Sequence, residues 1–89
     1  MKAYNIVVEG KVQGVFYRQS TREKAKELNV KGWVKNCDDG SVQIHAEGDP
    51  ADLSEFIKWC HQGPRNARVS GVKHMEIQVN GYSGFEIIR

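Results

Sequence analysis

The sequence predicts an α+β fold in which two helices pack on one face of an antiparallel sheet. Short runs rich in β-branched and aromatic residues predict strands, and two longer segments repeat apolar residues at helical spacing. Each helical segment is apolar along one side only, as expected for a helix that covers a sheet. One layer of helices on one layer of strands accounts for these features.

The first strand is expected over residues 3–9, and the glycine-bearing segment after it ends the strand. A helix is expected from about residue 18 to residue 28, where a stripe of residues recurs at three- and four-residue spacing and charged residues occupy the other faces. The stripe consists of Tyr17, Thr21, Ala25 and Leu28. Asn29 tolerates a left-handed backbone, so we expect it to end this helix.

A β-hairpin is expected next. Residues 31–37 and 41–47 have the composition of strands, and the run Asp38-Asp39-Gly40 between them contains residues that tolerate positive φ. The two runs are therefore expected to pair through a tight turn.

The second helix has the clearest boundaries. Asp49 is placed to cap it, and Pro50 occupies its first helical position. Its apolar stripe consists of Leu53, Phe56, Ile57 and Cys60. Gly63 and Pro64 follow and are expected to end the helix.

Two further strands complete the expected order. Residues 69–79 form one, Asn80-Gly81 marks a turn, and residues 85–88 form a short last strand. The order β-α-β-β-α-β with a short C-terminal strand is that of a ferredoxin-like α/β sandwich. A chain of 89 residues buries one core, so we expect residues 1–89 to form a single domain.

Composition excludes several classes of protein. Hydrophobic residues make up 39% and charged residues 27%, as in globular proteins, and no apolar run approaches the ~20 residues of a membrane span. The N-terminal segment lacks the pattern of a signal peptide, so we expect a cytoplasmic protein. A net charge of +2, with acidic and basic residues mixed along the chain, does not indicate nucleic-acid binding.

The two cysteines form no metal-binding or redox motif. Cys37 and Cys60 lie far apart, with no CxxC spacing and no histidine cluster nearby. We expect two reduced thiols and no metal site, since a disulfide would require the fold to bring the two residues together.

The segment GKVQGVFYR, residues 10–18, is the first candidate site. Its glycines allow the backbone to turn so that several N–H groups converge, and the start of the helix adds further unpaired donors. With the Arg18 guanidinium beside them, these groups suit a phosphate or a carboxylate. Two alternatives stay open: an ordinary turn with a surface arginine, and a helix that begins after Arg18 at a capping box formed by Ser20 and Glu23.

Asn36 is the second candidate, just before the expected turn. An asparagine at such a position usually serves turn geometry, and position alone favours that interpretation.

Four segments together resemble the acylphosphatase family. They are GKVQGVFYR at 10–18, GWVKNCDDGSV at 32–42, GPRNARV at 63–69 and GFEIIR at 84–89. The similarity spans essentially the whole chain and implies a ferredoxin-like fold. It also implies hydrolysis of the carboxyl-phosphate bond of small-molecule acyl phosphates to a carboxylate and inorganic phosphate, without metal or cofactor. Inorganic phosphate or a similar anion is then expected to bind as product or inhibitor.

The resemblance implies roles for particular residues. The family's phosphate-binding arginine falls on Arg18, and its water-orienting asparagine falls on Asn36. The phosphate loop, whose backbone N–H groups bind the substrate, falls on Gly14, Val15, Phe16, Tyr17 and Arg18. This placement favours a helix that begins close to Arg18.

Two positions depart from the family pattern. Tyr17 stands where phenylalanine is usual, and its hydroxyl needs a hydrogen-bond partner if it is buried. Cys37 stands where threonine or leucine is usual, and it places a thiol beside the proposed water site. We hypothesise that oxidation of this thiol inhibits the enzyme.

A binding module is the main rival, because RNA-recognition domains have the same element order. Their basic-glycine-aromatic-glycine run is missing: the nearest segment, KGWVKNCDDG, has valine and lysine where small and aromatic residues are needed. A ligand-binding regulatory domain or an inactive relative is the third interpretation, which the presence of both Arg18 and Asn36 disfavours. We therefore expect an active, monomeric enzyme that binds neither nucleic acid nor membrane.

Overall fold

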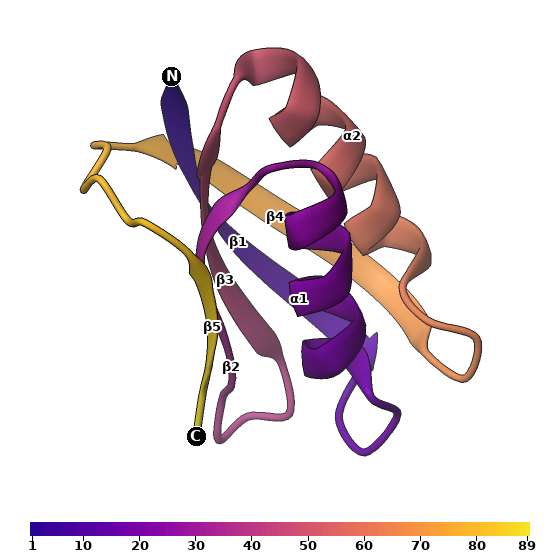
Figure 1. The fold of residues 1–89 in the computed structure, drawn as a ribbon. Helices are drawn as coiled ribbons and strands as arrows, with labels where there is room; N and C mark the ends of the chain where they lie inside the picture. The colour runs from indigo at the N-terminus through magenta and orange to yellow at the C-terminus, as the bar shows by residue number, and fades with distance from the viewer.

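The computed structural model describes residues 1–89 and has the element order that the sequence predicts. The strands are β1 (Lys2–Lys11), β2 (Lys31–Asn36), β3 (Val42–Gly48), β4 (Arg68–Ile77) and β5 (Phe85–Ile88), and the helices are α1 (Tyr17–Glu27) and α2 (Pro50–Gln62). Both helices lie on one face of a single five-stranded sheet (Figure 1). The ferredoxin-like α+β sandwich is therefore confirmed. Neither helix is long and apolar enough to cross a membrane.

The sheet has the strand order β4-β1-β3-β2-β5. β1 pairs antiparallel with β3 and with β4, and β2 and β3 form the expected antiparallel hairpin. β5, however, pairs in parallel with β2, with Val34 opposite Ile87. The prediction of a purely antiparallel sheet is thus wrong at one edge, where the sheet is mixed.

Glu47 gives the physical reason for this difference. The turn at Asn80 and Gly81 does not return the chain beside β4, because the backbone N–H groups of Asn80, Gly81 and Tyr82 all donate to the Glu47 carboxylate. Glu47 lies on β3 in the middle of the sheet, on the face away from the helices. The segment after β4 is therefore held across the sheet, and the next strand adds to the opposite edge (Figure 1).

Glu47 is a buried carboxylate, only 1% exposed, and His45 Nε2 donates to it over 2.8 Å. Burial alone would raise the pKa of Glu47. The hydrogen bonds from the Asn80 N–H, from His45 and from the N–H groups of Tyr82 and Gly81 outweigh this effect and hold the pKa below its ordinary value. Glu47 is therefore a charged, fully bonded structural group.

The helix ends follow the sequence with one exception. Asn29 has a φ of 58°, as expected of a left-handed stop after α1, and Gly63 ends α2 with a φ of 67°. Asp49 is in the N-cap position of α2, directly before Pro50, but its side chain makes no capping hydrogen bond. The position of this cap was predicted correctly, whereas its hydrogen bond is absent.

The core between the helices and the sheet is one cluster of 15 buried residues. Its largest fully buried side chain is that of Tyr17, whose hydroxyl donates to the carbonyl oxygen of Cys60 over 2.8 Å. The partner that this hydroxyl requires is therefore the last turn of α2. Both cysteines are free thiols in the structure.

Candidate active site

A cleft of about 320 Å³ opens at the start of α1, beside the ends of β2 and β5. Nine residues line it: Val12, Gly14, Phe16, Tyr17, Arg18, Gln19, Asn36, Ile87 and Arg89. Both candidate residues, Arg18 and Asn36, are among them, although they come from different elements. The structure thus brings Arg18 and Asn36 to one cleft with Gly14, Phe16 and Tyr17 of the expected phosphate loop, whereas Val15 of that loop is not among the lining residues.

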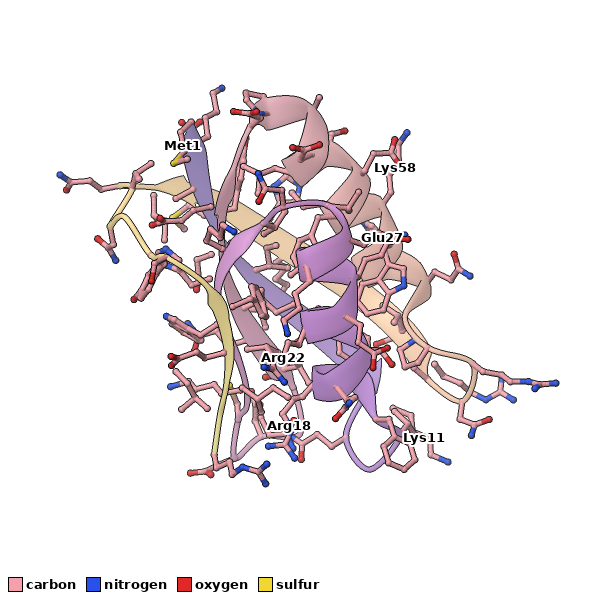
Figure 2. The ribbon with its side chains drawn as sticks, viewed as in Figure 1. Met1, Lys11, Arg18, Arg22, Glu27 and Lys58 are labelled. Carbon is pink, nitrogen blue, oxygen red and sulfur yellow. The ribbon has the colours of Figure 1, made fainter.

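Arg18 is the second residue of α1, and Figure 2 shows it at the start of this helix, beside the ends of β2 and β5. α1 begins at Tyr17 with Phe16 in the N-cap position, and the Ser20 N–H donates to the Phe16 carbonyl oxygen over 3.0 Å. The alternative start at a Ser20 and Glu23 capping box is therefore wrong. The helix begins next to Arg18, so its first unpaired N–H groups open onto the cleft.

The loop before α1 has an unusual backbone. Gly14 has a φ of 74° and Phe16 a φ of 63°, a left-handed conformation that costs a bulky residue about 1–3 kcal/mol. The N–H groups of Gly14, Val15 and Phe16 donate to no other backbone group. Successive unpaired N–H groups in such a turn form a concave site that suits an anion.

Asn36 is the last residue of β2, and its neighbours shape the following turn without it. The Asp39 carboxylate accepts hydrogen bonds from the Ser41 N–H, at 2.9 Å, and from the Ser41 hydroxyl, at 2.6 Å. The hydroxyl bond, together with the N–H bond, lowers the pKa of Asp39 despite the small opposing effect of burial. Since Asp39 and Ser41 supply the turn geometry, the interpretation of Asn36 as a turn former loses its support.

The charged side chains that line the cleft are all of one sign. Its lining includes two arginines, Arg18 and Arg89, and no carboxylate side chain. Such a lining attracts an anion, and a guanidinium can bind two oxygens of a phosphate at once. No group of three or more histidine, cysteine, aspartate or glutamate side chains is arranged to hold a metal ion.

Sequence reasoning missed four of the lining residues. Val12 and Gln19 flank the recognised loop and could have been found from its position. Ile87 and Arg89 reach the cleft only because β5 pairs in parallel with β2, a pairing that no local signal predicts.

The fold and the cleft define a ferredoxin-like α+β protein with its candidate site where the first helix begins. Residues 4–87 match the family model described as Acylphosphatase. The crystal structure of acylphosphatase from Bacillus subtilis superposes with a TM-score of 0.97 at 36% identity, and all of both chains is covered. An acylphosphatase structure from Coxiella burnetii gives a TM-score of 0.95 at 42% identity, covering 98% of this chain and 92% of the other.

A curated acylphosphatase from Rubrobacter xylanophilus is 47% identical over 87 residues, which are 97% of this chain and 79% of the relative. The chain therefore belongs to the acylphosphatase family, and the resemblance seen in its sequence is confirmed. It is an enzyme of the hydrolase class whose substrates are acyl phosphates.

Proposed function

We propose that residues 1–89 act as a single catalytic domain that hydrolyses the carboxyl-phosphate bond by in-line attack of water, without metal or cofactor. The supporting observation is the common cleft of Arg18, Asn36 and the loop with unpaired N–H groups. An anion-binding loop, a guanidinium and a side-chain amide then face one bound substrate from separate elements.

The phosphoryl group binds first in this scheme. The N–H groups of residues 14–18 and the Arg18 guanidinium bind its equatorial oxygens and stabilise the charge that they hold in the transition state. These donors are already oriented by the loop and by the helix start, so little reorganisation accompanies the reaction.

Asn36 orients the water. Its amide offers one acceptor and two donors, which suffice to direct a water molecule along the line opposite the leaving oxygen. A phosphate oxygen of the substrate takes the water's proton, so no strong base is needed. The leaving group is a carboxylate, which departs without prior protonation, so no general acid is needed either.

We further propose a monomeric, cytoplasmic enzyme that binds inorganic phosphate as product and inhibitor and binds neither nucleic acid nor membrane. The mild net charge of +2 supports the absence of a nucleic-acid partner, since such proteins usually have a strongly basic face.

The test is the hydrolysis of benzoyl phosphate by pure protein in EDTA, with Arg18→Ala and Asn36→Ala compared with Arg22→Ala. Arg22 is an exposed arginine further along the same helix (Figure 2). It is not among the residues that line the cleft. We expect the parent and Arg22→Ala to be equally active and each site variant to lose at least about 10²-fold in kcat. Loss of the parent's activity in EDTA, or full activity in either site variant, would contradict the proposal.

A further inference from the structure

We propose that Gln13 is a positioning residue whose side-chain amide fixes the phosphate loop relative to Asn36. The inference rests on the proposed function, because it concerns the distance between the phosphate loop and Asn36, which are the two halves of the proposed catalytic site. Gln13 directly precedes Gly14 of the loop, and its side chain reaches the turn that follows β2.

The contacts of Gln13 join the two halves of the site directly. Its Nε2 donates to the Cys37 carbonyl oxygen over 2.8 Å and to the Ser41 carbonyl oxygen over 2.9 Å. A primary amide has two N–H bonds, so both are used. Cys37 immediately follows Asn36, so one partly buried side chain connects the residue before the loop with the residue after the proposed water-orienting group.

The sheet itself does not hold these segments together. Pairing between β1 and β3 ends at Val8 and Val42, and from there β1 continues to Lys11 beside β4 alone. No backbone hydrogen bond links residues 12–16 to residues 36–41. The two bonds of Gln13 therefore span a gap that the strand ladder leaves open.

The turn does not need Gln13 for its own formation. The Cys37 N–H donates to the Ser41 carbonyl at 2.8 Å, and the Gly40 N–H donates to the Cys37 carbonyl at 3.1 Å. Both carbonyls that Gln13 contacts thus already have a backbone partner, and Gln13 occupies their second acceptor sites. Without Gln13 the turn would keep its shape and lose its fixed position relative to the loop.

This arrangement predicts a specific kinetic signature. The loop and Arg18 bind phosphate by themselves, whereas in-line attack also requires the water near Asn36 to be aligned with the bound phosphoryl group. A misplacement of about 1 Å can reduce a rate about 10²-fold. Loss of the Gln13 bonds should therefore lower kcat and leave the inhibition constant of inorganic phosphate nearly unchanged.

The variants are Gln13→Met, which keeps the length of the side chain without its donors, and Gln13→Glu, which replaces the donors by acceptors that face two carbonyls. Gln43→Met is the matched control. Gln43 is also partly buried and donates through Nε2 over 2.8 Å, but to Asn5 Oδ1 on the sheet face away from the helices. We expect both Gln13 variants to lose about 10- to 100-fold in kcat and Gln43→Met to keep parental kinetics.

A double-mutant cycle separates positioning from a merely structural role. In the Asn36→Ala background, Gln13→Met should lower kcat less than about 2-fold, because the side chain that Gln13 positions is already gone. Phosphate should inhibit Gln13→Met within about 2-fold of the parental constant. The inference would be overturned if Gln13→Met lowered kcat equally in the parental and Asn36→Ala backgrounds. It would also be overturned if phosphate binding weakened as much as kcat fell.

The two proposals can also fail separately. Full activity of Gln13→Met beside an inactive Asn36→Ala would reject the role of Gln13 and leave the proposed function standing. Full activity of Asn36→Ala would reject both, since nothing would then remain for Gln13 to position.

Discussion

Gly63 packs against the ring of Tyr17 so closely that a β-carbon at position 63 would lie 2.7 Å from Tyr17 Cε2. Gly63 also has a φ of 67°, which favours glycine. Because Tyr17 directly precedes Arg18, the end of α2 sets where the first turn of α1 lies. The packing of the second helix is thereby connected to the candidate active site.

Gly63→Ala is expected to lower the free energy of unfolding by about 2–4 kcal/mol, because left-handed strain of about 1–2 kcal/mol adds to the cost of overpacking against Tyr17. Displacement of Tyr17 should also reduce kcat. Urea unfolding and kinetics of the variant would measure both effects. Gly81→Ala is the control, since Gly81 has a φ of 82° but no atom within 4 Å of an added β-carbon. Equal destabilisation of the two variants would show that the Tyr17 contact has no effect.

Tyr17→Phe tests the hydroxyl by which this chain departs from the family pattern. Burial raises the pKa of Tyr17, so the hydroxyl stays protonated and donates to the Cys60 carbonyl at any physiological pH. Its removal should lower the free energy of unfolding by about 1 kcal/mol, the net contribution of one hydrogen bond. Since the ring remains, kcat should not change. A fall in kcat with unchanged stability would instead place the hydroxyl in the catalytic machinery.

Glu47→Gln should alter how stability depends on pH. The carboxylate has a pKa below its ordinary value of 4.5 in the folded chain, so its ionised form stabilises the fold above that value. This stabilisation is lost as the pH falls below about 4.5 toward the lowered pKa of the folded state. Thermal unfolding between pH 3 and pH 7 should therefore show a weaker acid dependence for Glu47→Gln than for the parent. Parallel curves would mean that Glu47 does not contribute.

The two thiols should react differently. Burial raises the pKa of Cys60 to about 12 against the opposing effect of the Tyr17 hydroxyl, and its side chain is fully buried, whereas Cys37 is partly exposed. A thiol reagent should thus label one cysteine per native chain and both in urea. Labelling or peroxide treatment should inhibit the parent and leave Cys37→Ser unaffected. An unchanged rate after modification of Cys37 would rule out the oxidation hypothesis.

Most of the local structure could be predicted from the sequence because its signals are local. The helical stripe of α2, with Pro50 before it and Gly63 after it, gave boundaries that the structure confirms. The start of α1 was ambiguous, since Ser20 and Glu23 also have capping-box spacing. The left-handed Phe16 lies at the true start, and nothing in an exposed phenylalanine indicates that backbone conformation.

Partners far apart in the sequence could not be predicted in the same way. Asn80-Gly81 favours a hairpin locally, and only the carboxylate of Glu47, on another strand, holds that segment elsewhere. Arg18 was singled out as a cation beside a glycine-bearing turn and Asn36 as the residue before the next turn, and the family resemblance then gave each its role. Their common cleft is a property of the folded chain alone. The bonds of Gln13 are likewise invisible in a sequence, because the acceptors are backbone carbonyls.

The parallel strand β5 also bears on how the chain folds. Residues 85–88 complete the sheet beside β2, so a long loop must close before Ile87 can take its place in the cleft. Closing such loops reduces chain entropy before native contacts form, and domains rich in non-local pairings accordingly fold in milliseconds to seconds. During synthesis, the cleft residues between Val12 and Asn36 leave the ribosome early. The cleft stays incomplete until residues 87–89 emerge, because Ile87 and Arg89 also line it.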